Sequence, residues 1–215
     1  MLEKKTISDY VYDKILERIV QLEYAPKEKI SETQLSASLD VSRAPIKTAL
    51  AKLEKEGFVS IKPQYGTFVS EISLERAKGI CEVREILEVE AVKKAVHNIT
   101  EKQLNQLEIL FNKLDAMSEF NDEKRQFIYD VDTQLHNAIY LAGQNIIIEE
   151  IILRYKPEIQ RIQHANMTWA DRKIHTQSEM KKIFNALKIR DEEQAAKAMK
   201  EHISNIRRTL EKNYD

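Results

Sequence analysis

Glycine and proline are scarce in this chain, because 215 residues contain only four of each. Tight turns and irregular backbone depend on these two residue types, so their scarcity argues against sandwich, TIM-barrel and Rossmann-type folds and favours long helices. No uninterrupted apolar run approaches the roughly 20 residues that a bilayer span needs, which argues against a membrane protein.

Other absences bear on where the protein works. The single cysteine, Cys81, cannot form an internal disulfide, and residues 1–10 lack the apolar stretch and cleavage site of a signal peptide. We therefore expect a soluble, cytoplasmic protein with no membrane partner. Neither sign of charge dominates, with 34 Lys and Arg against 35 Asp and Glu, so a basic patch for nucleic acid must be a local feature.

The residues that favour β-structure lie in one short stretch. Residues 58–62 and 67–70 are joined by Pro63-Gln64-Tyr65-Gly66, which predicts a hairpin. From about Ser73 onward, apolar residues recur with helical spacing. The sequence therefore predicts a mainly α protein with two domains, residues 1–72 and residues 73–215.

The second domain has helical periodicity throughout, interrupted by short breaks. Pro157 either kinks the fourth predicted helix or begins its second half, because proline inside a helix removes a hydrogen bond. Breaks of only a few residues favour an antiparallel bundle. Six helices are predicted, at about residues 74–97, 101–119, 123–142, 146–165, 171–189 and 191–212.

Three helical segments precede the hairpin, and the first spans residues 7–22. The third is predicted to be capped by Ser42, to carry Pro45 in its first turn and to stop at Gly57. A helix, a short helix, a tight turn, a longer helix and a hairpin, in this order, predict an N-terminal winged helix-turn-helix.

The third helix carries the candidate DNA contacts, since the second of the paired helices in this fold enters the major groove. Its first exposed side chains are predicted to be Arg43, Ala44, Lys47 and Thr48. An arginine at this place can form two hydrogen bonds to a guanine edge, and Lys47 can hold a phosphate or a base.

The local charge leaves two interpretations open. Residues 41–62 contain five basic and two acidic side chains, although residues 1–72 contain 11 of each sign. The basic excess fits a DNA-binding face, whereas a solvated helix face of mixed charge is the plainer alternative.

A family resemblance is found in the third helix and the turn before it. Residues 35–59 read LSASLDVSRAPIKTALAKLEKEGFV. They resemble the GntR family of bacterial transcription regulators, whose signature is close to L-A-x-x-L-x-V-S-R-x-P-V-R-x-A-L-x-x-L-x-x-x-G-L-V. Residues 24–30 resemble the family's upstream segment, with Lys27 in place of its glycine, and residues 64–69 resemble its wing.

The resemblance implies DNA contacts at Ser42, Arg43, Lys47 and Gly66. The family's wing tip, which Gly66 matches, approaches the minor groove. Lys47 stands where the family usually has arginine. Because lysine lacks the planar fork of arginine, this departure implies an altered operator preference.

Residues 73–215 resemble the all-helical FCD effector domain of the FadR-like GntR subgroup. The resemblance implies a domain that binds a small effector and takes part in dimerisation. Three stretches carry it: residues 82–88 (EVREILE), residues 132–136 (DTQLH) with the following Gly143-Gln144-Asn145, and residues 179–202.

Three residues of this domain are candidate metal ligands. Asp132 and His136 are four residues apart, so both project from one helix face and can chelate one ion. His202 lies near Ala198 and Met199, on a face of the last helix that should point into the bundle. From the residues alone, a buried histidine hydrogen-bonded to a neighbour is the alternative. The resemblance implies a divalent metal of Zn or Mn type at these positions.

The family's usual centre contains one aspartate and three histidines, and this chain departs from it. Met180 stands where the middle histidine is expected, 11 residues before Asp191. A thioether is a weak ligand for zinc or manganese. We therefore expect the metal to be bound at partial occupancy or to be absent.

Arg84 is the candidate effector-binding residue. An arginine buried in a bundle needs an anionic partner. One interpretation pairs it with Glu88 or Asp132, and the other, which the family resemblance supports, has it bind the carboxylate of a small effector. The two interpretations are compatible, because a carboxylate ligand could displace an internal one.

These observations together predict a ligand-responsive transcription regulator. We expect it to bind a palindromic operator as a homodimer and to respond to a small carboxylate or sugar acid, with or without a metal. One alternative is a metal-dependent hydrolase built on Asp132, His136 and His202, which the lack of a nucleophile or base motif disfavours. Another is a metal-independent regulator with a larger acyl or sugar ligand.

Overall fold

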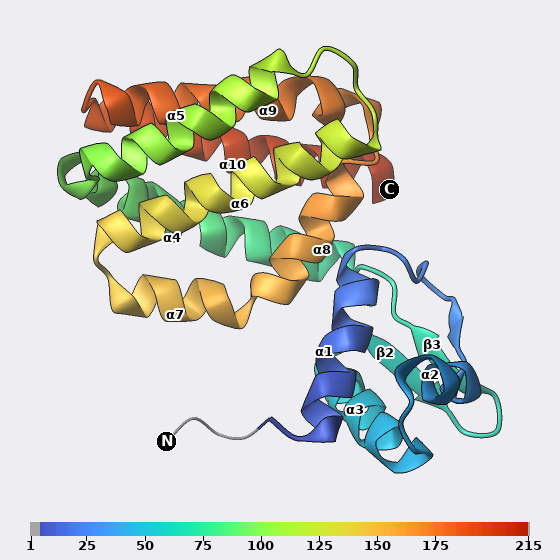
Figure 1. Ribbon diagram of the computed structural model, residues 1–215. Coiled ribbons are helices and arrows are strands. Elements are labelled where there is room, and N and C mark those ends of the chain that lie inside the picture. Colours follow the sequence, from blue (N-terminus) through green and yellow to red (C-terminus); the bar gives the residue numbers. More distant parts are fainter. Residues whose placement is uncertain (1–4, 215) are drawn as a thin grey trace. The chain divides into compact units, whose positions relative to one another are not determined.

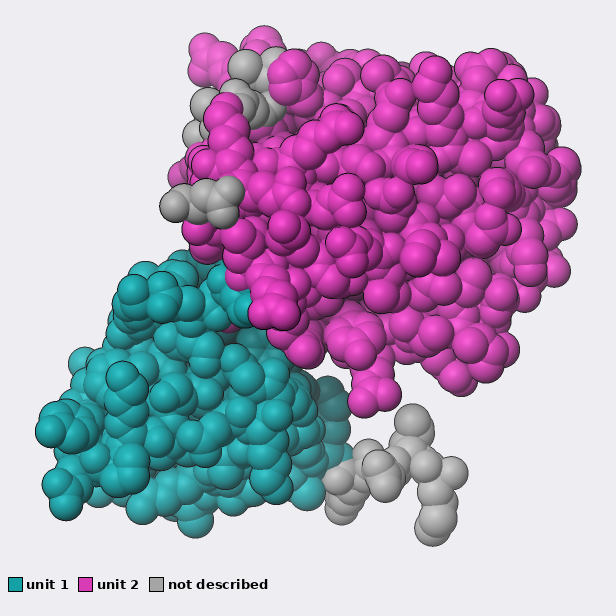
Figure 2. All heavy atoms as spheres, turned by 180° about the vertical axis from the view of Figure 1, so that it is seen from behind, with its two compact units in different colours: residues 1–73 teal, residues 74–215 magenta. Residues whose placement is uncertain are grey.

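The structure is a computed structural model that describes residues 5–214, apart from the side chains of residues 170, 171, 173 and 174. The chain folds into two compact units, residues 1–73 and residues 74–215 (Figure 2). Within residues 5–214, no helix combines the length and the apolar character that a membrane crossing requires.

Residues 5–73 of the first unit form three helices and a small antiparallel sheet whose strands lie in the order β1-β3-β2. Lys29 of β1 is opposite Phe68 of β3, and Val59 of β2 is opposite Val69. The hairpin and the three helices confirm the predicted winged helix-turn-helix, whereas β1 was not predicted. The elements are α1 (Ile7–Val20), β1 (Lys29–Ile30), α2 (Glu32–Leu39), α3 (Arg43–Lys55), β2 (Val59–Lys62) and β3 (Gly66–Val69).

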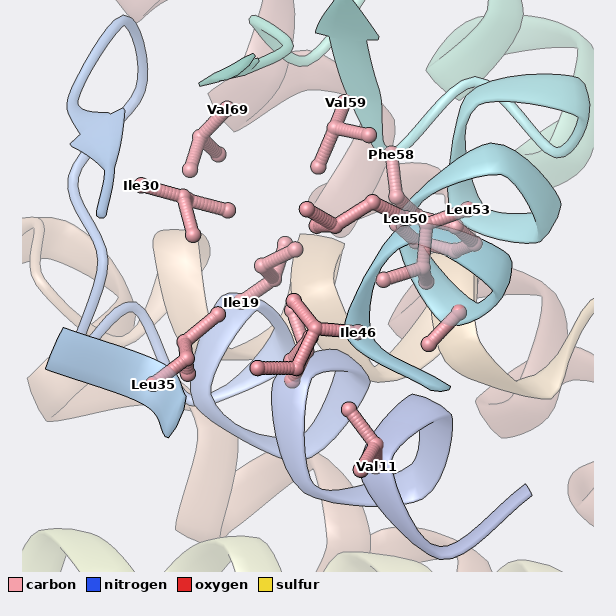
Figure 3. Packing of buried hydrophobic residues seen from close by; sticks show 12 residues of the cluster. Val11, Ile19, Ile30, Leu35, Ile46, Leu50, Leu53, Phe58, Val59 and Val69 are labelled. Atoms are coloured by element: carbon pink, nitrogen blue, oxygen red, sulfur yellow. The ribbon is translucent and has the colours of Figure 1, made fainter. Parts of the chain in front are cut away.

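A cluster of buried apolar residues holds α3 in place (Figure 3). One face of α1 carries Val11, Ile15 and Ile19 at helical spacing, and all three are completely buried. This face packs against the buried residues of α3, among them Ile46 and Leu50. Because α3 buries this side, its opposite side faces solvent.

The ends of α2 and α3 agree only partly with the sequence prediction. Asp40 has a left-handed backbone, with φ of 52°, and ends α2 in the tight turn. Ser42 occupies the N-cap position of α3, but its side chain makes no capping hydrogen bond. Pro45 lies in the first turn of α3, where its missing N–H has no helical partner to lose.

The second unit contains seven helices among its described residues, one more than predicted. The predicted helix at 146–165 is two helices that meet at Tyr155, with Pro157 in the first turn of the second. A proline ring clashes with the carbonyl four residues earlier, so one helix does not continue through it. The elements are α4 (Leu74–Asn98), α5 (Glu101–Ala116), α6 (Asp122–Gly143), α7 (Ile146–Arg154), α8 (Lys156–Asn166), α9 (Ala170–Lys188) and α10 (Glu192–Tyr214).

The helix α4 lies at the centre of the bundle, where α10 and α6 both pack along it (Figure 1). Gly143, the last residue of α6, lies against the backbone of α4, since a Cβ atom at this position would be 3.1 Å from the carbonyl oxygen of Ala91. Gln144 then turns the chain with a left-handed backbone, and the side chain of Asn145 caps α7. The bundle confirms the predicted fold class of the second domain.

Candidate functional site

The predicted DNA contacts lie together on one exposed face at the start of α3. Ser42, Arg43, Lys47 and Thr48 are all exposed, while Ile46 between them is completely buried. Arg43 Nη2 donates one long hydrogen bond of 3.5 Å to Thr33 Oγ1. A bond this long is weak, so the guanidinium is available to an external partner.

The wing places Gly66 at the start of β3, directly after the exposed turn. Its φ of 113° lies in the region that favours glycine, and an added Cβ would be 2.8 Å from Lys29 Cε. Lys29 belongs to the strand that sequence reasoning missed, and it adds a positive charge beside the wing. Tyr65 is 72% exposed.

In the second unit, three predicted ligands meet inside the bundle. Asp132 and His136 lie on α6, His202 lies on α10, and all three are buried. The Oδ1 atom of Asp132 is 3.3 Å from His202 Nε2 and 3.7 Å from His136 Nε2. One ligand atom from each residue lies within 4.8 Å of the other two, which is compact enough to surround one ion.

The unpaired atoms of this cluster fit a metal. Asp132 Oδ1, His136 Nε2 and His202 Nε2 are buried and have no hydrogen-bond partner among the described residues. A buried polar atom without a partner costs free energy, and here three such atoms converge on one point. Oxygen and imidazole nitrogen are suitable donors for zinc or manganese. The cluster can therefore hold a divalent cation.

Two carboxylates orient the histidine rings. Glu88 Oε2 is 2.7 Å from His136 Nδ1, and Glu179 Oε2 is 3.0 Å from His202 Nδ1. Each carboxylate accepts the Nδ1–H of its ring, so Nε2 is left as the free nitrogen at the convergence point. The two interpretations of the histidines, as hydrogen-bonded core residues and as metal ligands, are therefore compatible, because each ring uses Nδ1 for the hydrogen bond and presents Nε2 as a ligand atom.

The cluster favours ionised carboxylates. Burial alone would raise the pKa of Asp132, but His136 and His202 outweigh burial and lower it to about 2. The pKa of Glu179 is likewise lowered to about 2, because His202 and Arg172 outweigh its burial. Burial opposes the charge on His202 as well, yet the carboxylates of Asp132 and Glu179, 3.3 and 3.0 Å from its ring nitrogens, raise its pKa. A charged carboxylate at the centre is the form that binds a cation.

The contact from α9 to His202 is made by Glu179. Met180, the residue in place of the expected histidine, is completely buried and directly follows Glu179 in the chain. Sequence reasoning missed the roles of Glu179 and of Gln163, whose Nε2 donates to Asp132 Oδ2 at 2.6 Å. Glu179 opens the stretch that resembles the family, so an acidic residue beside a ligand position was the available signal.

Arg84 is buried, as predicted, and pairs with Glu88. Its Nε donates to Glu88 Oε1 at 2.6 Å, and its Nη2 is 3.5 Å from Glu88 Oε2. Burial opposes both charges, but their mutual attraction lowers the pKa of Glu88 and raises that of Arg84. Arg84 Nη1 is buried and has no partner within the described part of the chain. Glu88 thus occupies the Nε and Nη2 side of the guanidinium, and the Nη1 amino group is left without a partner.

A cavity of about 270 Å³ adjoins Arg84 and the cluster. It can accommodate a small organic ligand. Its lining includes Arg84, His136, Tyr140, Lys156 and Gln163. The charged residues of the lining are the cations Arg84 and Lys156 and the carboxylate Glu149, so the positive charges outnumber the negative one. His136 places the cavity beside the candidate metal centre.

The comparisons with known proteins identify the family. The family model described as bacterial regulatory proteins, gntR family, matches residues 7–69, and the FCD domain model matches residues 79–205. The chain belongs to the GntR family. It is thus a GntR regulator of transcription with an FCD domain, as the sequence resemblance implied.

Relatives of this GntR regulator span most of its length. It is 25% identical over 202 residues to the HTH-type transcriptional repressor RspR of Escherichia coli, covering 93% of this chain and 87% of RspR. It is 26% identical over 236 residues to the HTH-type transcriptional repressor NanR of Klebsiella aerogenes, covering 97% and 86%. The solved structure of E. coli McbR/YncC superposes with a TM-score of 0.77 at 22% identity, covering 99% of this chain and all of that one, which supports the fold.

The hydrolase alternative is excluded by this family membership, since the relatives are transcription regulators and not enzymes.

Proposed function

We propose that this GntR regulator binds a palindromic operator as a homodimer, and that a small carboxylate or sugar acid, held together with a divalent metal, modulates this binding. The observation that carries the proposal is the convergence of three unpaired ligand atoms beside a cavity of the FCD domain whose lining includes Arg84 and Lys156. A symmetric dimer matches a palindrome, because each DNA-binding unit reads one half-site.

In each half-site α3 enters the major groove. Arg43 contacts a guanine edge, Lys47 contacts a phosphate or base, and Ser42 and Thr48 contact the backbone. Gly66 brings the wing backbone close to the minor groove. The exposure of all these residues except the half-buried Gly66 supports the assignment.

The metal is held by Asp132, His136 and His202. A bound divalent cation supplies positive charge and open coordination positions for an effector oxygen. With three protein ligands instead of four, affinity is lower than in a site with an additional histidine. Glu88, Glu179 and Gln163 keep the ligand atoms aimed at one point, and such outer contacts are worth about 10–100-fold in metal affinity.

The effector occupies the 270 Å³ cavity, where Arg84 Nη1 and Lys156 attract its carboxylate. Because Glu88 already uses the Nε and Nη2 groups of Arg84, an effector carboxylate accepts a single hydrogen bond from Nη1 or displaces Glu88. Displacement would alter how Glu88 holds His136. This gives a direct route by which the effector changes the structure around the metal.

The metal part is tested by titrating chelator-treated protein with Zn²⁺ or Mn²⁺. We expect binding that is weak in the parent, lost in His136→Ala and tightened in Met180→His, since imidazole is a better ligand than a thioether. Met180→Leu is the matched control and should bind like the parent. Tight stoichiometric binding by the parent that Met180→His leaves unchanged would show that Met180 never limited the site.

The regulatory part is tested with the chain's own upstream DNA. A thermal-shift screen of small carboxylates and sugar acids identifies a ligand by the rise in melting temperature, and gel shifts then measure its effect on operator binding. Arg84→Lys, which keeps the charge beside Glu88 but lacks the fork, should weaken the ligand response while operator affinity is unchanged. An unaltered response would remove Arg84 from the effector site.

A further inference from the structure

A second cavity lies between α9 and α10, and its lining includes Glu179, which contacts the candidate ligand His202. Its volume is about 350 Å³, and the cationic residues Arg172, Lys182 and Arg208 contribute to its lining. Neither Lys182 nor Arg208 belongs to the cavity beside Arg84. Three cations around one hollow attract an anion.

Arg172 is built into this cavity in the way that Arg84 is built into the first. Only 3% of Arg172 is exposed, and its Nη1 is 2.8 Å from Glu179 Oε1. The other oxygen of Glu179 is 3.0 Å from His202 Nδ1. In both places, therefore, a buried arginine contacts a glutamate that in turn contacts a histidine of the cluster, as Arg84, Glu88 and His136 do. The Nε of Arg172, like Nη1 of Arg84, is buried without a hydrogen-bond partner in the part of the chain that the structure describes.

The one carboxylate in the cavity lining does not cancel its positive charge. Glu179 already accepts hydrogen bonds from Arg172 and from Asn205 Nδ2 at 2.9 Å, and it contacts His202. Lys182 is 62% exposed and 3.7 Å from Glu201, a separation at which an exposed pair is weak. Arg208 Nη1 donates to the neutral Asn205 Oδ1 at 3.1 Å. Lys182 and Arg208 therefore leave a net positive cavity.

We propose that this cavity is a second anion-binding site, and that it takes a small phosphate-bearing molecule. A dianionic phosphate presents several acceptor oxygens, which match the fork of an arginine and the point charge of a lysine. The volume admits a phosphate with a small organic group. This ligand is separate from the carboxylate effector of the first cavity.

An anion in this cavity also affects the metal cluster, a consequence that depends on the proposed metal function. An oxyanion that pairs with Arg172 competes with Glu179 for the same guanidinium. Because Glu179 orients His202, this competition changes the affinity of the cluster for metal. By linkage, metal in the cluster changes the affinity of the cavity for the anion by the same factor.

The test is a titration of chelator-treated full-length protein with inorganic phosphate at constant ionic strength, followed by ³¹P NMR and calorimetry. The cavity variant is Lys182→Ala with Arg208→Ala. The matched control, Lys188→Ala with Lys200→Ala, removes one exposed lysine from each of the same helices outside the cavity. Lys156→Ala reports on the first cavity.

We expect saturable binding in the parent, the control and Lys156→Ala, and binding weaker by roughly tenfold or more in the cavity variant, since two charge-assisted contacts are lost. Equal binding by the parent and the cavity variant would overturn the proposal, as would loss of binding in Lys156→Ala alone or no saturable binding by the parent.

A second measurement separates this proposal from the metal function. Electron paramagnetic resonance gives the Mn²⁺ affinity with and without phosphate, and we expect phosphate to change it in the parent and the control but not in the cavity variant. If Mn²⁺ does not bind at all while phosphate still binds, the metal function fails and the phosphate site stands. If Mn²⁺ binds and phosphate does not, the reverse holds.

Discussion

The two units of this protein differ in where their candidate functional residues lie: on the surface in the DNA-binding unit and in the interior in the helical unit. Among the described residues, the DNA-binding unit buries one polar side chain, Thr67, and its candidate DNA contacts are exposed. The helical unit buries a network of charged residues that is also its candidate site: Arg84, Glu88, Asp132, His136, Arg172, Glu179 and His202. Function and stability are therefore separable in the first unit and coupled in the second.

The largest expected effect is on stability in the helical unit. Arg84→Ala leaves Glu88 buried without its guanidinium partner, and breaking a buried ion pair costs about 3–5 kcal/mol. Urea unfolding followed by the fluorescence of Trp169, the sole tryptophan, measures the free energy of unfolding of this unit. Arg43→Ala, an exposed arginine in the other unit, should change the stability of that unit by no more than about 0.5 kcal/mol, measured by its amide NMR signals in urea. Equal effects of the two variants would remove the contrast between the units.

The stability of the two units should also respond differently to acid. Asp132 and Glu179 have pKa values lowered to about 2 from ordinary values of 3.8 and 4.5. Such carboxylates stabilise the fold fully above their unfolded pKa, and this contribution is lost as the pH falls through the folded value. His202, with its raised pKa, contributes in the other direction, below its ordinary value of 6.5.

We therefore expect the metal-free helical unit to lose stability as the pH falls below about 4.5, the ordinary glutamate value. The DNA-binding unit, whose described core contains no carboxylate, should persist further into acid. Trp169 fluorescence follows the helical unit, and amide NMR signals follow the DNA-binding unit. Simultaneous loss of both signals would mean that the two units unfold together.

A smaller expected effect concerns metal affinity. Glu179→Gln keeps the shape of the side chain but removes the charge that orients His202, so we expect about 10–100-fold weaker binding of Mn²⁺. Glu201→Gln, on the exposed side of α10, is the control and should bind like the parent. Parent-like binding by Glu179→Gln would show that the carboxylate is structural only.

The expected effects on DNA binding are similar in size to the effect on metal affinity, but they leave the stability of both units unchanged. Arg43→Ala should cost about 1–3 kcal/mol of operator binding, and Lys47→Ala should weaken binding to all sequences and reduce its salt dependence. Both should leave the urea unfolding curve unchanged, since both residues are exposed. If Arg43→Ala binds the operator like the parent, α3 is not the recognition helix.

The contrast between the units also explains what the sequence could predict. The helical spacing of apolar residues and the presence of turn residues were sufficient to predict α1, α3 and the hairpin, because apolar faces and glycines can be recognised in the local sequence. The two-residue strand β1 was missed, since it exists only by pairing with β3. The break between α7 and α8 was left open between a kink and a new start, because proline limits the conformation without deciding it.

In the candidate site, spacing brought Asp132 and His136 onto one face, and family resemblance added His202. The pairing of Arg84 with Glu88, four residues apart, was one of two partners considered. The contact of Glu179 with His202 joins two helices, and no period along one helix could reveal it. Contacts between residues on different helices depend on how the helices pack, and the local sequence does not predict this packing.

Gly143 illustrates how packing controls chemistry in this molecule. Because Gly143 has no side chain, α6 can approach α4 closely at this point, in contact with Ala91. His136 lies about two turns before it on α6, and Glu88 lies about one turn before Ala91 on α4. A side chain at position 143 would press on the backbone of α4, so we expect it to separate the two helices that bring Glu88 Oε2 within 2.7 Å of His136 Nδ1. Gly143, which has no functional group of its own, is thus expected to influence the orientation of His136, a candidate metal ligand.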